Sequence, residues 1–175
     1  MLDLLSQTRA ALAAGAYMPA LMVTLTLPDI CGALASDNGR ASGSKYKRWL
    51  VDWFQLNAGS PYAQPIDAAG AEQIYAFRCS LLHQGSARPQ GGHQPIAFIE
   101  PEPGAAQLHN LSTDVSGDVV GWISVPLFVD EMSDAVQRWW SVYGETTTVS
   151  RNYGRYARRR EGGLPPHAAG APVIA

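Results

Sequence analysis

The segment covering residues 71–85, AEQIYAFRCSLLHQG, constrains the fold of this chain more than any other. Its large apolar side chains recur at i, i+3, i+7 and i+8, the spacing of one buried helix face: Ile74, Phe77, Leu81 and Leu82. Arg78 interrupts this apolar face, and Gly85 is placed to end the helix in a left-handed conformation. The segment therefore predicts an amphipathic helix with an arginine on its buried side and His83 in its last turn.

Arg78 and His83 form an Arg-x4-His motif, with Cys79 directly after the arginine. This motif resembles the signature of the HEPN superfamily (higher eukaryotes and prokaryotes nucleotide-binding domain), in which Asn often follows the Arg. This chain departs from that pattern at Cys79. The phrase LPDICGALAS at residues 27–36, followed by YAFRCSLLHQG, is also similar to a group of uncharacterised bacterial proteins. The resemblance covers residues 21–85.

The resemblance implies a mainly α fold, a four- to five-helix bundle. It also implies a metal-independent endoribonuclease whose cleft forms at a homodimer interface, acting in a toxin or defence role. An antitoxin protein would then be a partner, and no cofactor or metal would be needed. Arg78 would hold the scissile phosphate and His83 would transfer protons, with Asp29, Cys79 and Ser80 in supporting positions. The negative end of the helix dipole favours a protonated His83, which would donate to a leaving oxygen.

Helix geometry places a condition on this site. Five residues turn a helix by roughly 500°, so Arg78 and His83 point about 140° apart. We expect their long side chains to converge over a groove if a second helix packs across, as the same helix of a second copy would. The small residues Ala76 and Cys79 would let another backbone approach closely.

Asp29 allows two interpretations. Pro28 should kink or divide the helix that contains it, because proline removes a backbone donor, and Asp29 would then cap the resumed helix. Alternatively, Asp29 pairs with Arg78 across the bundle, because a buried carboxylate needs such a partner.

The net charge of −2, with 16% charged residues, excludes a global electrostatic attraction to nucleic acid. Lys45, Lys47 and Arg48 lie beside aromatic residues on a predicted helix, where they would contact RNA or form a solvated face. Residues 151–160 carry five of the thirteen basic residues.

Hydrophobic periodicity and turn residues predict one domain, residues 1–145, with a basic, Gly- and Pro-rich C-terminal tail at 146–175. Helices are expected at 2–14, 17–35, 45–57 (capped by Ser44), 71–85 and 126–143. A small antiparallel β element is expected at about 94–125, with strands at 95–100, 106–111 and 119–125.

No segment has the pattern of a targeting signal, and the uncharged stretch between Arg9 and Asp29 is interrupted by Gly and Pro. We therefore expect a cytoplasmic protein that does not enter a membrane. Cys31 and Cys79 are expected to be free thiols, and the His and Cys spacing predicts no metal site.

Three hypotheses follow. The first is an active HEPN-like ribonuclease. The second is a catalytically inactive dimer of the same type that binds a nucleotide, RNA or a protein partner. The third gives Arg78 and His83 only a structural role in tying the bundle together.

Overall fold

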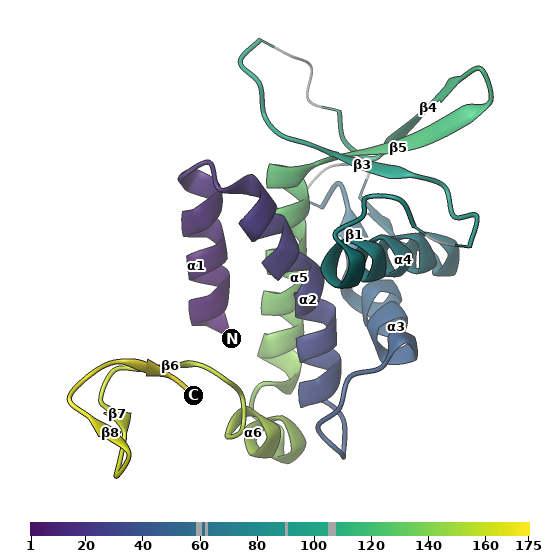
Figure 1. Ribbon diagram of the computed structural model, residues 1–175. Helices are drawn as coiled ribbons and strands as arrows, with labels where there is room; N and C mark the ends of the chain where they lie inside the picture. The colour runs from purple at the N-terminus through teal and green to yellow at the C-terminus, as the bar shows by residue number, and fades with distance from the viewer. Residues whose placement is uncertain (59–60, 62, 90, 105–107) are drawn as a thin grey trace.

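The computed structural model describes residues 1–58, 61, 63–89, 91–104 and 108–175, and about half of the chain is helical. The described residues form six helices: α1 (Leu2–Ala13), α2 (Tyr17–Leu34), α3 (Gly43–Trp53), α4 (Ala68–Gln84), α5 (Val125–Tyr143) and α6 (Thr147–Tyr153). A three-stranded sheet lies at one end of the helices and the C-terminal segment lies at the other (Figure 1). The expectation of a mainly α protein is confirmed.

Helix α2 is at the centre of the packing, because it contacts α1, α3, α4, α5 and α6. Leu25, Leu27 and Cys31 on this helix are completely buried. By length and composition α2 could cross a membrane, but here half of it is buried inside the protein. The helix continues through Pro28, so of the two expected outcomes, a kink or a division, the division does not occur. Packing on several sides holds the helix although one backbone hydrogen bond is lost.

Helix α3 begins earlier than expected. Its N-cap is Ser42 and not the expected Ser44. The Ser42 hydroxyl accepts from the Lys45 backbone N–H. The helix ends at Trp53, because Phe54 is extended and leads into strand β1 (Gln55–Leu56), which pairs with β2 (Gln64–Pro65). The expected end at residue 57 is therefore too late.

The sheet lies before α5, as expected, but it is mixed and not antiparallel. Strands β4 (Leu111–Val115) and β5 (Asp118–Ser124) form an antiparallel hairpin, whereas β3 (Ile96–Ile99) pairs parallel to β5. The expected strand at 106–111 is misplaced: β4 begins only at Leu111, and residues 106–107 of that prediction lie outside the described residues. The strand order β3-β5-β4 places the last strand in the middle, an arrangement that alternation along the chain does not reveal.

The C-terminal region, expected to be a tail, begins with a packed helix. Helix α6 contributes the buried Val149 and Asn152, and the Asn152 side chain donates to the carbonyls of Leu34 and Ser36 at the end of α2. Beyond α6 two short antiparallel ladders follow, β6 (Arg159–Arg160) with β9 (Val173–Ile174) and β7 (Gly163–Leu164) with β8 (Ala168–Ala169). The helical core therefore extends past the expected boundary at residue 145.

Candidate functional site

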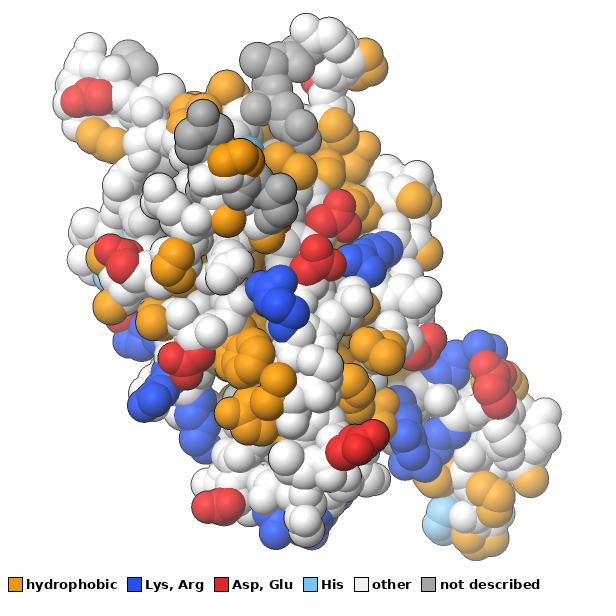
Figure 2. Space-filling model, turned by 180° about the vertical axis from the view of Figure 1, so that it is seen from behind, with side chains coloured by type: hydrophobic (Ala, Val, Ile, Leu, Met, Phe, Trp, Pro, Cys, Tyr) orange, Lys and Arg blue, Asp and Glu red, His pale blue; other side chains and the backbone are white. Residues whose placement is uncertain are grey.

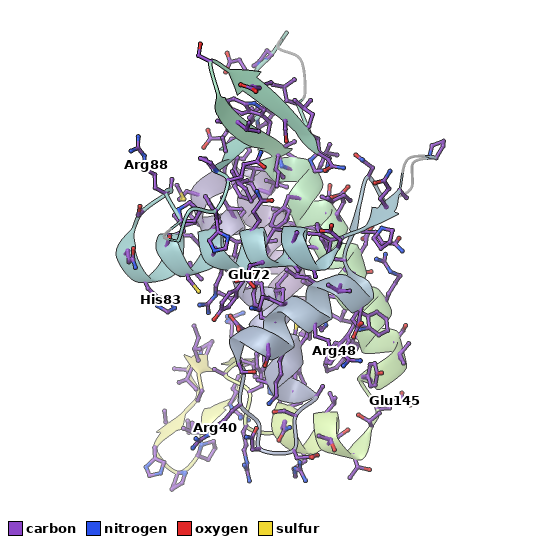
Figure 3. The ribbon with its side chains drawn as sticks, turned by 90° about the vertical axis from the view of Figure 1, so that its right-hand side faces the viewer. Arg40, Arg48, Glu72, His83, Arg88 and Glu145 are labelled. Carbon is purple, nitrogen blue, oxygen red and sulfur yellow. The ribbon has the colours of Figure 1, made fainter. Side chains whose placement is uncertain are left out.

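Helix α4 carries the Arg-x4-His motif and has well-defined ends. The Asp67 carboxylate accepts from the Gly70 N–H at 2.8 Å, and Gly85 ends the helix with φ 64°. This confirms the expected stop at Gly85. His83, labelled in Figure 3, projects from the C-terminal end of α4 and is exposed.

Arg78 and His83 meet within a single chain. The Arg78 Nη1 atom lies 2.8 Å from Nε2 of His83. The two residues start about 140° apart on the helix, so the long arginine side chain closes the gap. The two side chains therefore converge without the second helix that we expected to bring them together.

This contact assigns the hydrogen-bonding role of His83. Arginine offers only donors, so His83 Nε2 must be the acceptor and carries no proton in this arrangement. The expected protonated imidazole does not fit this contact, because it has no acceptor atom. Nε2 of His83 becomes available to another donor only when Arg78 turns to a different acceptor.

Asp29 pairs with Arg78, as one of the two interpretations predicted. Its Oδ2 atom lies 2.5 Å from Arg78 Nη2, and the two side chains are 17% and 16% exposed. Burial raises the pKa of Asp29, although the charge of Arg78 acts in the opposite direction. Burial alone would lower the pKa of Arg78, but the charge of Asp29 and the contact with Cys79 raise it overall. The pair therefore holds a charged guanidinium against α2, and Asp29 is not a helix cap.

Tyr75 and Cys79 form the α4 side of this site. Cys79 Sγ lies 3.9 Å from Arg78 Nη1. The pKa of Tyr75 is raised, mainly by a hydrogen bond to Cys79 and to a smaller extent by burial. The Tyr75 ring lies 5.2 Å from that of Tyr46 on α3. Tyr75 was missed in the sequence, although its position one turn before Cys79 places it on the same helix face.

The other residues predicted for the site do not contact Arg78 or His83 as Asp29 and Cys79 do. Ser80 is 3% exposed, so it is closed to a substrate. Lys47 pairs with Glu72 at 2.6 Å and lies 5.4 Å from the centre of the Tyr75 ring, which places it at the border of the site. Lys45 donates to the Arg40 carbonyl and Arg48 pairs with Asp52. These three side chains therefore do not form one free basic surface.

Basic side chains elsewhere on the molecule are also interspersed with acidic ones. On the face shown in Figure 2, Lys and Arg stand close to Asp and Glu, and a group of basic side chains lies over the C-terminal segment. In that segment Arg159 pairs with Glu161 at 2.6 Å and Arg160 donates to the Ala175 carbonyl.

A second pair that includes a histidine, His109 with Glu131, lies away from α4 and was not predicted. His109 Nε2 lies 3.2 Å from both carboxylate oxygens of Glu131, and His109 Nδ1 accepts from the Ser124 N–H. Glu131 also accepts from the Ala58 N–H. The two side chains are 5% and 7% exposed. They therefore hold the segment before β4 against α5 and do not offer a reactive surface. They are 22 residues apart, a separation that has no local sequence signal.

No family model, curated protein or solved structure matches this chain. The resemblance to the HEPN superfamily therefore depends on the motif residues themselves. In the described part of the chain, no three His, Cys, Asp or Glu residues are grouped as a metal ion would require.

Proposed function

We propose that this chain is a HEPN-like, metal-independent endoribonuclease that acts on single-stranded RNA. One observation carries the proposal: the Arg78 guanidinium lies within hydrogen-bonding distance of Nε2 of the exposed His83. The two groups supply what cleavage by a neighbouring 2′-OH requires, a positive charge for the phosphate and a base for the hydroxyl. The proposal also takes α1–α5 as the HEPN-like bundle and places the protein in the cytoplasm.

Each residue then has a defined task. His83 Nε2 takes the proton of the ribose 2′-OH, and the freed oxygen attacks the adjacent phosphorus. The bond from this phosphorus to the 5′-oxygen of the next nucleotide breaks, and the leaving 5′-oxygen takes a proton from water. Arg78 donates to a phosphate oxygen through a planar fork that lysine does not reproduce. Asp29 keeps the guanidinium oriented by holding Nη2, so the Nη1 side is directed towards His83.

We further propose a homodimer whose interface includes α4. A substrate phosphate must replace His83 as the partner of Arg78 Nη1, and a second copy would enclose this exposed end of the helix. In a toxin or defence role, an antitoxin protein would be a further partner at the same surface.

The Asp29–Arg78 pair favours a second candidate function. Because the carboxylate already balances the guanidinium charge, the same surface suits a catalytically inactive dimer that binds a nucleotide, RNA or a protein partner. Catalysis separates the two candidates.

The test is cleavage of varied single-stranded RNAs in the presence of a chelator. We expect products with a 2′,3′-cyclic phosphate, and no cutting where the attacking 2′-OH is replaced by hydrogen. His83→Ala should reduce the rate by about 10²-fold or more, and Arg78→Lys should also be poorly active. Rates are measured by gel electrophoresis, and folding is checked by circular dichroism.

His167→Ala and Arg88→Lys are matched controls, because both side chains are exposed and lie outside the site. They should cleave like the wild type. If folded wild-type protein cuts no faster than His83→Ala, the enzyme proposal fails. Retained RNA binding that Arg78→Lys weakens would then support the inactive binding dimer.

A further inference from the structure

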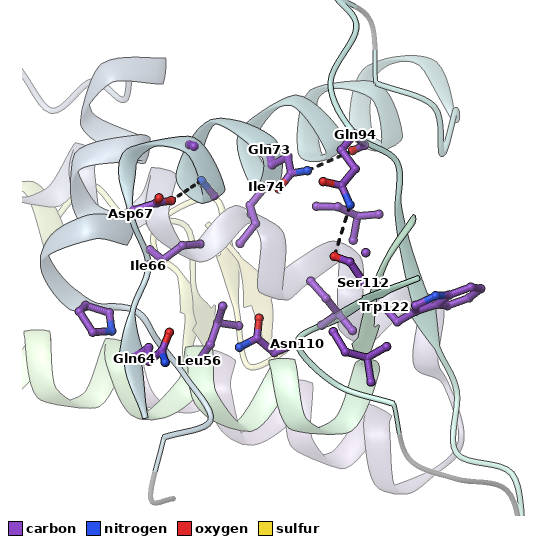
Figure 4. Close-up of a pocket in the computed structure, with 17 residues that line it drawn as sticks. Leu56, Gln64, Ile66, Asp67, Gln73, Ile74, Gln94, Asn110, Ser112 and Trp122 are labelled. Carbon is purple, nitrogen blue, oxygen red and sulfur yellow. Dashed lines mark hydrogen bonds between the residues drawn. The ribbon is translucent and has the colours of Figure 1, made fainter. Parts of the chain in front are cut away.

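A cavity of about 460 Å³ lies between the first half of α4, the β1–β2 ladder and the sheet (Figure 4). Helix α4 contributes Gly70, Gln73 and Ile74 to its lining, whereas none of the residues of the Arg78–His83 site borders it. The volume is in the range of pockets that bind small molecules. This cavity is therefore a separate candidate site, and an inference about it does not depend on RNA cleavage.

The polar lining of the cavity consists mainly of carboxamides. Its polar side chains include Gln64, Asp67, Gln73, Gln94, Asn110 and Ser112. Asp67, the acidic member, already accepts the Gly70 N–H as the cap of α4. The described lining contains no Lys or Arg, so the cavity offers no cation for a phosphate or carboxylate. Its chemistry suits an uncharged ligand with both donors and acceptors.

Two of these amide groups make long hydrogen bonds to other described residues of the lining. Gln73 Nε2 donates to the Gln94 carbonyl at 3.4 Å, and Gln94 Nε2 donates to Ser112 Oγ at 3.4 Å. Both distances exceed the usual range of protein hydrogen bonds. Figure 4 shows these residues on one side of the cavity, with Gln64 and Asn110 across from them. A ligand with better geometry can therefore replace these contacts.

The position of Asn110 is fixed by the contacts of its neighbour His109. It has a positive φ of 53° and directly follows His109, whose ring is held by Glu131 and by the Ser124 N–H. The buried pair thus fixes the chain that presents Asn110 to the cavity. Branched aliphatic residues form the apolar walls, with Ile66 and Ile74 from the α4 side and Ile96 and Ile123 from the sheet. Such walls suit a flat ring.

We propose that this cavity binds a free nucleobase or nucleoside. A carboxamide places a donor beside an acceptor, and Asn and Gln pair in this way with the edge of a base. Enzymes that enclose a single base likewise combine hydrogen bonds to its edge with contacts to its faces. The absence of Lys and Arg from the described lining favours the uncharged base or nucleoside over its phosphate esters.

The experiment titrates adenosine, guanosine, cytidine and uridine into the ¹⁵N-labelled full chain and follows side-chain amide signals by NMR. We expect at least one nucleoside to shift the signals of Gln73, Gln94 and Asn110 saturably. Its 5′-monophosphate should bind no more tightly, because the described lining offers no cation. Glucose and N-acetylglucosamine, which carry hydroxyls without a flat ring, should leave these signals in place.

Gln73→Leu should weaken nucleoside binding by about tenfold or more, which is the lower part of the range for a contact of two hydrogen bonds to a base. Gln137→Leu is the matched control, since Gln137 is exposed on α5 and does not line the cavity, and it should bind like the wild type. If Gln73→Leu does not fold, Gln94→Leu makes the same test. The proposal is overturned if no nucleoside shifts the signals, if the sugars shift them equally, or if Gln137→Leu weakens binding as much.

Discussion

Cys31 illustrates how one buried residue makes stability depend on pH. Its thiol is fully buried, and burial raises its pKa well above the usual 9.0. The unfolded chain loses this proton first, so the free energy of unfolding should fall as the pH rises above about 9, by up to ~1.4 kcal/mol per pH unit. Tyr46, buried with its hydroxyl on the Leu25 carbonyl, has a raised pKa and should add to the decline above about pH 10. Urea unfolding between pH 7 and 11 measures both effects. Cys31→Ala should show a shallower decline between pH 9 and 10 and run parallel to the wild type below pH 8; an unchanged slope at high pH would contradict the assignment.

At the scale of elements, α6 supplies hydrogen-bond donors to backbone carbonyls at and just after the C-terminal end of α2. The Asn152 side chain, 7% exposed, donates to the carbonyls of Leu34 at 2.9 Å and Ser36 at 2.7 Å. Asn152→Ala would leave these acceptors without the amide, so we expect a loss of about 1–3 kcal/mol in the free energy of unfolding. The neighbouring Arg151 also donates to this region, to the Asp37 carbonyl, but it is exposed. Arg151→Ala should therefore cost less than about 0.5 kcal/mol. Chemical denaturation of both variants measures the difference, and equal losses would show that burial of the amide does not matter.

For the whole molecule, the proposed homodimer would cover the exposed end of α4. The partly exposed Ala76 and Cys79 offer a small-residue path for a second copy, with His83 beside it. Sedimentation velocity at micromolar concentration should show a dimer for the wild type. Ala76→Glu should shift it to a monomer, because a charge would be buried at the interface. Ala10→Glu, an equally polar change on the exposed face of α1, should leave the dimer intact. A monomeric wild type, or the same result for both variants, would remove the dimer from the proposal.

Local sequence patterns determined most of the helices. The apolar spacing and Gly85 in the α4 segment predicted its course and its end, because periodicity and a left-handed stop are properties of neighbouring residues. The Asp29–Arg78 pair could be predicted as one of two alternatives, since a carboxylate in an apolar helix needs a partner.

The tertiary structure decided what depends on distant residues. The parallel pairing of β3 with β5 and the meeting of His109 with Glu131 join segments whose proximity no local pattern encodes. The same holds for Asn152, which belongs to a segment with tail-like composition and yet is buried against the end of α2. In the site, sequence spacing placed Arg78 and His83 on different faces of α4; only the course of the arginine side chain brings them together. Backbone periodicity determines where a side chain starts, and packing determines where it ends.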